Sequence, residues 1–156
     1  MKPFKPIFWV APIIYKKELK PRRKYLCFGE RNQGCRTASN YGFVIVAKEG
    51  VSPSVIEQEK FESRYWTLRG LGLYWIWCRL FNPTKLCIVE CMSRAQEIRA
   101  DVQYLKAKGY IQDAERRASM FAILDAHFMV DAPNYPWFAR AGWDIERAEA
   151  EILKHL

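Results

Sequence analysis

The stretch Asn82–Pro136 constrains the fold most strongly, because it carries the start and stop signals of two consecutive long helices. Asn82-Pro83 is a capping residue followed by proline at the first helical position, where the missing N–H is harmless. The helix that begins there is expected to run to Lys108 and end at Gly109. A second helix is expected over residues 111–130, and the two prolines that follow end it.

Similar signals predict further helices on both sides of this pair. Ser52-Pro53 is another capping residue followed by proline, and the helix that it starts is expected to run toward Leu68. The apolar stretch Leu73–Phe81 comes next and must form either core or a partner interface. Asp144 is the expected cap of a last short helix to Leu156.

The residues before Ser52 do not have a helical pattern. Residues 1–23 contain four prolines, so they are expected to form an extended N-terminal arm that packs along the domain or onto a neighbouring subunit. Two short aromatic and β-branched runs, Tyr25–Phe28 and Tyr41–Ala47, predict an antiparallel hairpin with a long loop. Residues 24–156 are therefore expected to form a single α+β domain with a short antiparallel β-hairpin or sheet and about four to five helices.

The charge of the chain favours acidic partners. The 156 residues carry a net charge of +8, which suits nucleic acid, an anionic membrane surface or an acidic protein face. The compact basic run Lys20, Arg22, Arg23 and Lys24 is the candidate contact, although a solvated turn would have the same composition.

The most apolar stretch, residues 71–81, is too short to span a membrane, so no membrane partner is expected. Prolines interrupt the apolar N-terminal run and no cleavage site follows it, so no secretory signal is expected.

The cysteines and histidines argue against a structural zinc site. Cys78, Cys87 and Cys91 lie in apolar, helical sequence and are expected to be small core residues. Cys27 and Cys35 flank a glycine-rich region and could pair in an oxidising setting, although a reducing compartment is expected. The chain has no CxxC sequence and only two distant histidines, which excludes a zinc knuckle.

The segment Gln58-Glu59-Lys60-Phe61-Glu62 carries the candidate chemistry. On a helix, Gln58 and Glu62 lie one turn apart on the same face, with Glu59 beside them. This is the layout of an H-E-x-x-H zinc-peptidase helix in which both histidines are replaced and the general-base glutamate remains. On a later helix, the segment Glu97–Asp101 fits an E-x-x-A-D pattern. The alternative is that the first segment, within Glu57–Ser63, is merely a solvated charged helix face.

Taken together, these segments resemble the zincin families whose third zinc ligand is a glutamate in an E-x-x-A-D helix, and in particular the small metallopeptidase-like proteins of phage genomes. The resemblance covers residues 1 to about 105. It implies a minimal gluzincin-type core with a helical extension from about residue 110. It also implies that Gln58, Glu62 and Glu97 occupy former ligand positions and that Glu59 occupies the vestigial general-base position.

The residues that replace the histidine ligands predict which cation, if any, such a site would bind. A Gln/Glu/Glu set would bind zinc weakly, whereas a hard divalent cation such as Mg²⁺, Mn²⁺ or Ca²⁺ suits oxygen ligands. Without a metal, the clustered carboxylates require another cation, which Arg64, Arg94 or Arg99 could supply. We therefore expect an ion-pair cluster without a cofactor, with a hard-metal site as the alternative.

These expectations favour a metallopeptidase-like protein that is catalytically inactive and serves as a structural or interaction component of a phage particle or its assembly. Its partners would be other proteins of that assembly, and its location the virion or the host cytoplasm. Two alternatives stay open: an active metal-dependent hydrolase with an oxygen-ligand site, and a basic virion protein that binds nucleic acid.

Overall fold

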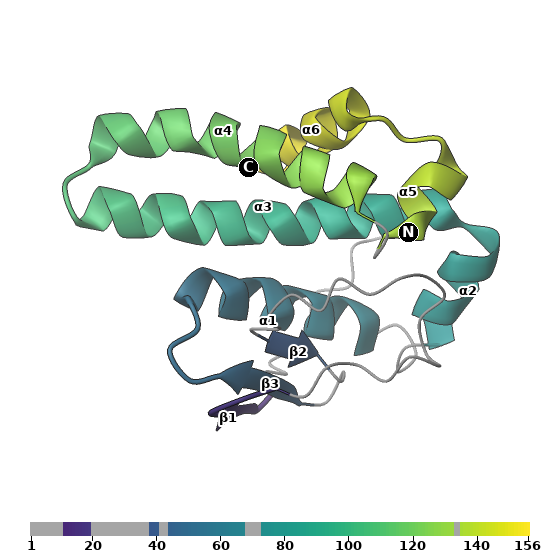
Figure 1. Cartoon of the computed structure of the whole chain (residues 1–156), viewed down its shortest axis with the longest axis horizontal. Coiled ribbons are helices and arrows are strands. Elements are labelled where there is room, and N and C mark those ends of the chain that lie inside the picture. The colour runs from purple at the N-terminus through teal and green to yellow at the C-terminus, as the bar shows by residue number, and fades with distance from the viewer. Residues whose placement is uncertain (1–10, 20–37, 41–43, 68–72, 133–134) are drawn as a thin grey trace, which may run out of the picture.

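The computed structural model describes residues 11–19, 38–40, 44–67, 73–132 and 135–156. These residues form a small sheet and a larger set of helices, which confirms the expected α+β class. The elements lie in layers: the sheet, then helix α1 (Pro53–Thr67), then α3 (Pro83–Ala107), then α4 (Ile111–Asp131) with α6 (Ile145–Lys154) (Figure 1). Within the described part of the chain, no helix has both the length and the apolar character needed to cross a membrane.

The sheet has three strands in the order β1-β3-β2. The central strand β3 (Ile45–Lys48) pairs in parallel with β1 (Ile13–Lys16) and antiparallel with β2 (Ala38–Asn40). Ile45 and Ala47 are fully buried on the face of β3 that contacts α1. The sheet therefore packs against α1 through β2 and β3.

The expected hairpin requires a correction. The antiparallel partner of β3 is Ala38–Asn40, which includes residues expected to lie in the loop, whereas the expected partner Tyr25–Phe28 lies outside the described residues. The expected arm also contributes a strand, because Ile13–Lys16 extends the sheet on its parallel side. A parallel pairing joins segments far apart in sequence, so no local hairpin pattern could have revealed it.

The helix boundaries follow the capping signals. The side chain of Asn82 accepts a hydrogen bond of 3.2 Å from the backbone N–H of Lys85, and Pro83 opens α3. Gly109 follows α3 with φ of 88°, a left-handed conformation that favours glycine. Asp144 caps α6 by accepting a hydrogen bond of 2.8 Å from the N–H of Arg147. These three predictions are confirmed.

Two short helices complete the described structure. Helix α2 (Leu73–Phe81) connects the α1 layer to the α3 layer at one end of the molecule (Figure 1). Helix α5 (Pro136–Ala141) was not expected from the sequence and raises the number of helices among the described residues to six, above the expected four to five. Proline at its first position and Gly142 after its end, with φ of 70°, account for its limits.

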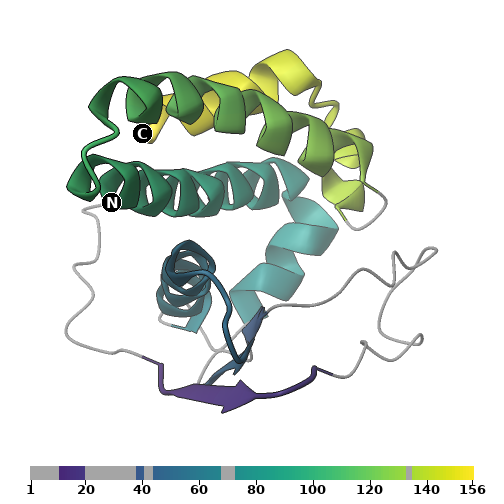
Figure 2. The ribbon, with the colours of Figure 1, turned by 60° about the vertical axis from the view of Figure 1, so that its left-hand side comes forward.

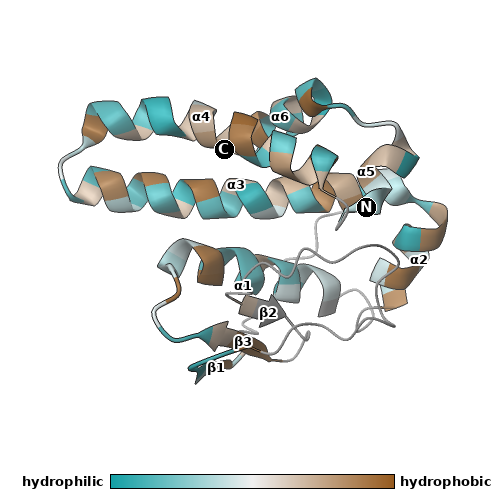
Figure 3. Ribbon diagram, in the orientation of Figure 1, coloured by the Kyte–Doolittle hydropathy of each residue, from teal (hydrophilic) through white to brown (hydrophobic). Residues whose placement is uncertain are grey.

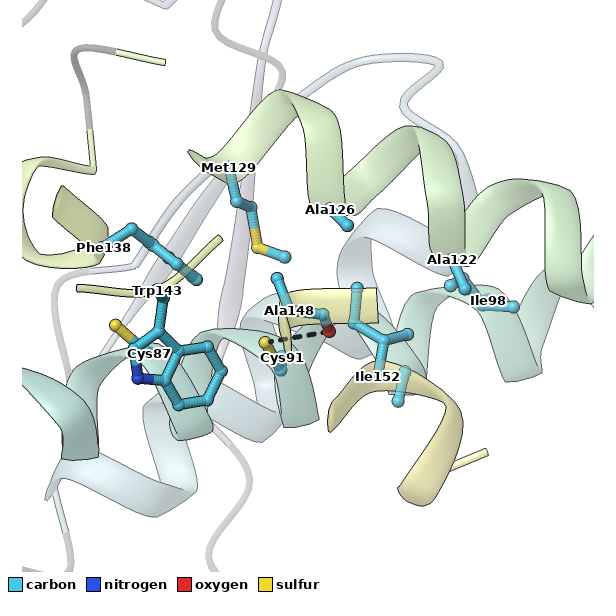
Figure 4. Close-up of a cluster of buried hydrophobic side chains, with 11 residues drawn as sticks. Cys87, Cys91, Ile98, Ala122, Ala126, Met129, Phe138, Trp143, Ala148 and Ile152 are labelled. Carbon is cyan, nitrogen blue, oxygen red and sulfur yellow. Dashed lines mark hydrogen bonds between the residues drawn. The ribbon is translucent and has the colours of Figure 1, made fainter. Parts of the chain in front are cut away.

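The main hydrophobic core lies between α3, α4, α5 and α6 (Figure 4). Its members are fully or nearly fully buried and range from alanine to tryptophan in size, and they include Cys87, Cys91, Ile98, Ala122, Ala126, Met129, Phe138, Trp143, Ala148 and Ile152. The alanines allow the helices to approach closely, and Met129 and Phe138 fill the remaining space.

The cysteines of α2 and α3 are buried thiols, as the sequence predicted. The thiol of Cys91 donates a hydrogen bond of 3.7 Å to the carbonyl of Ala148, and burial raises the pKa of Cys87 to about 12. Thiols of this kind stay protonated and act as small apolar groups.

Candidate functional site

The candidate site is built on one polar face of α3. Glu90, Arg94 and Glu97 follow one another at helical spacings of four and three residues, so their side chains line up along this face. Arg94 Nε lies 3.5 Å from Glu90 Oε1, and Arg94 Nη1 lies 3.5 Å from Glu97 Oε2. The three side chains are only 13–20% exposed, so one guanidinium is shared by two largely buried carboxyl groups.

Two aromatic residues, Phe128 near the end of α4 and Tyr135 just before α5, contact Arg94. Arg94 Nη2 donates a hydrogen bond of 2.9 Å to the Tyr135 hydroxyl, and the guanidinium lies 5.5 Å from the centre of the Phe128 ring. The rings of Phe128 and Tyr135 contact each other edge to face, with centroids 5.9 Å apart. Arg94 is therefore fixed by a hydroxyl, a ring face and carboxyl groups at once.

Helix α1 contributes Glu62 to the same region. The hydroxyl of Ser93, which is fully buried on α3, donates a short hydrogen bond of 2.7 Å to Glu62 Oε1. Figure 2 shows α1 close to end-on beneath α3, so the two helices cross at an angle at this contact. A buried hydroxyl that donates to a carboxylate fixes the position of α1 against α3.

The pKa values show that the cluster holds more carboxyl groups than one arginine can neutralise. The pKa of Glu90 is raised to about 8, first by burial and then by the charge of Glu62, while Arg94 opposes the shift. The pKa of Glu97 is also raised, mainly by burial, as is the pKa of Asp125 on α4. In both cases Arg94 again lowers the pKa but does not offset burial.

Burial explains why Arg94 does not hold the pKa of Glu90 at its ordinary value, because desolvation of the charged carboxylate is the largest cause of the shift. Arg94 Nε is buried and has no hydrogen-bond acceptor among the described residues, although the carboxylate of Glu90 is 3.5 Å away. A buried ion pair of this kind offsets only part of the cost of burying a charge. Glu90 therefore binds its proton more tightly than an exposed glutamate does.

The residues predicted to occupy former ligand positions lie along this contact between α1 and α3. Glu62 bonds to Ser93, Glu97 pairs with Arg94, and the charge of Glu62 is close enough to raise the pKa of Glu97. Gln58 is buried on α1, one turn before Glu62 and on the same face. Glu59, the predicted vestigial general base, is partly exposed beside it on α1.

The other candidate residues lie elsewhere. Arg99 is exposed and donates to the backbone carbonyl of His155, and Arg64 is partly exposed on the second half of α1. The basic residues Lys20, Arg22, Arg23 and Lys24, and also Cys27 and Cys35, lie outside the described residues. Of the three candidate arginines, Arg94 is the one that lies among the carboxyl groups of α3.

The donor set does not fit zinc. It offers an amide and carboxylates but neither imidazole nor thiolate, and the Arg94 guanidinium stands 3.5 Å from the carboxylate that would be the third ligand. A bound dication would repel this guanidinium. Among the described residues, no group of three or more His, Cys, Asp or Glu side chains has the arrangement of a metal site.

Sequence reasoning did not identify Ser93, Glu90, Asp125 or Tyr135 as members of the site. The spacing of Glu90, Arg94 and Glu97 along one helix face was the one available signal for Glu90. Tyr135 is 41 residues from Arg94, and only the return of α4 along α3 brings them together. No local pattern marks such a contact.

Comparison with protein-family models, with curated proteins and with solved structures finds no match to this chain. The resemblance to the zincin families therefore depends on the residues themselves, Gln58–Glu62 and Glu97–Asp101, and stays a prediction.

Proposed function

We propose that the protein is a catalytically inactive, metallopeptidase-like protein that works as a structural or interaction component, in the setting of a phage particle or its assembly. The phage setting rests on the sequence resemblance. The absence of catalysis is argued from the geometry at the contact between α1 and α3.

One observation carries the proposal: protein groups already engage the carboxylates of the former ligand positions. Ser93 donates to Glu62 at 2.7 Å, and Arg94 lies 3.5 Å from Glu97. In a zinc peptidase, these positions must be free to bind the metal. Here a guanidinium held by Tyr135 and Phe128 supplies the positive charge, so the former site acts as a clamp between helices.

The test is a peptide-hydrolysis assay of the purified protein with added Zn²⁺ or Mn²⁺, in parallel with Glu59→Gln. We expect no metal-dependent hydrolysis and no difference between the two proteins, because Glu59 has no metal-bound water to activate. Glu57→Gln, on the same helix and exposed, is the matched control. Metal-dependent hydrolysis that Glu59→Gln abolishes and Glu57→Gln preserves would instead establish the alternative, a hydrolase with an oxygen-ligand metal site.

The net charge of +8 keeps nucleic-acid binding as a second candidate function. Binding through phosphate contacts predicts an affinity for DNA that falls steeply with salt, because bound counterions are released. Fluorescence anisotropy of a labelled oligonucleotide at increasing salt measures this. Absent binding, or binding insensitive to salt, would reject the candidate.

A further inference from the structure

Helix α2 presents its most apolar face to solvent. The residues of this face are 49–72% exposed and occur at the spacings of a single helix face: Leu73, Ile76, Trp77, Leu80 and Phe81. The buried side of the helix carries Cys78. In Figure 3, α2 stands at the edge of the described structure with hydrophobic residues over much of its ribbon. We call these five residues the α2 face.

Aromatic contacts order two rings of the α2 face, Trp77 and Phe81. Tyr74 and Trp77 stack with an interplanar angle of 9° and centroids 6.1 Å apart, and Trp77 lies 6.0 Å from Phe81. Tyr74 in turn contacts Trp66 of α1, with ring centroids 6.0 Å apart. Rings that are ordered before binding lose little conformational freedom when a partner covers them, which is a property of interface hot spots.

The α2 face is electrically neutral although the chain is basic. Helix α2 contains no acidic residue, and its one basic residue, Arg79, places its guanidinium 5.3 Å from the centre of the Trp75 ring. Trp75 and Arg79 lie on the side of the helix opposite Leu73 and Leu80. An acidic partner would therefore find no positive charge within this face, whereas an equally neutral, apolar surface would match it.

We propose that the α2 face binds the α2 face of a second copy of this chain, forming a two-fold dimer. The proposal rests on the interaction role argued above and names its partner. Two-fold contacts are self-complementary, so each apolar face covers the other and no like charges within the faces meet. The exposed parts of the five side chains amount to about 500 Å² per copy, and two such faces reach the roughly 1,000 Å² of a specific interface.

The test is sedimentation velocity of the full chain over a range of concentrations, with Leu80→Glu and Leu73→Glu as variants. We expect a concentration-dependent dimer for the wild type and at least a tenfold weaker association for each variant. Leu124→Glu is the matched control, because Leu124 is similarly exposed, at 56% against 60% for Leu80, but lies on α4. It should dimerise like the wild type. Circular dichroism checks that each variant stays folded.

Three results would overturn the proposal: a wild type that stays monomeric up to about 100 μM, which is weak for any specific interface, variants that dimerise unchanged, or a monomer that binds anionic lipid vesicles through Leu80. The hydrolysis assay is independent of this experiment. An inactive monomer would reject the dimer alone, and an active dimer would reject the proposed absence of catalysis alone.

Discussion

Helix α3 takes part in two contacts of opposite chemistry. Toward α4, α5 and α6 it presents Cys87, Cys91 and Ile98, which are fully or nearly fully buried in an apolar core. Toward α1 and the end of α4 it presents Glu90, Ser93, Arg94 and Glu97, which bond to charged and polar groups. We call the first the apolar core and the second the polar seam.

The difference shows what each region does. Close packing stabilises the apolar core, and this contribution does not change with pH near neutrality, because the buried thiols do not ionise there. The stability of the polar seam depends on protonation, because its carboxyl groups outnumber its guanidinium. Replacements in the two regions should therefore change the free energy of unfolding by different amounts, and the two changes should depend differently on pH.

The largest effect is expected in the apolar core. Phe138 is fully buried, so Phe138→Ala should lower the free energy of unfolding by about 3–5 kcal/mol, the usual cost of a large cavity. Urea denaturation at pH 5 and pH 8 should give the same loss at both pH values. Ile123→Ala on the outer side of α4, where the side chain is 40% exposed, is the control and should cost far less. A loss that changes with pH would break the distinction between the regions.

Arg94→Met should destabilise the polar seam by about 3 kcal/mol at pH 8, since it removes the cation that the buried carboxyl groups of Glu90 and Glu97 share. At pH 5, well below the pKa of about 8 at Glu90, this carboxyl group is protonated and needs no cation, so the loss should shrink by at least half. Lys106→Met, at an exposed position on the same helix, should cost within about 0.5 kcal/mol at both pH values. Equal losses at the two pH values would show that Arg94 acts through packing alone.

Glu90→Gln should stabilise the protein at high pH, by on the order of 2 kcal/mol at pH 8. Folding raises the pKa of Glu90 from 4.5 to about 8, so the folded state keeps a proton that the unfolded state releases. The contribution of Glu90 to stability is therefore fully present below pH 4.5 and is lost as pH rises through 8. The glutamine side chain does not titrate in this pH range, so the variant does not lose stability in this way. Denaturation curves from pH 4 to pH 9 should be flatter for the variant, and parallel curves would contradict the raised pKa.

Ser93→Ala should have the smallest effect of the four, a loss of about 1–2 kcal/mol from the broken hydrogen bond to Glu62. Ser119→Ala, at an exposed position on α4, is the control and should be nearly neutral. If both replacements cost the same, the short hydrogen bond between α3 and α1 does not contribute to their packing.

Local signals predicted much of this architecture. Asn82-Pro83, Gly109 and Asp144 set helix limits through their own backbone and side-chain chemistry, and each lies where the sequence placed it. The parallel pairing of Ile13–Lys16 and the contact of Tyr135 with Arg94 were not predictable, because both depend on how distant segments pack. The sequence suggested that Glu62, Glu97 and an arginine would meet, but it did not indicate that Ser93 and Tyr135 would hold them.

The most direct test of the proposal that the polar seam has replaced a metal site is thermal unfolding with and without Mn²⁺. A cation that binds only the folded state raises its stability with concentration. We predict that about 1 mM Mn²⁺ leaves the midpoint of the wild type unchanged, because Arg94 already supplies the positive charge. A midpoint that rises with Mn²⁺ in the wild type and stays constant in Glu97→Gln would contradict this account.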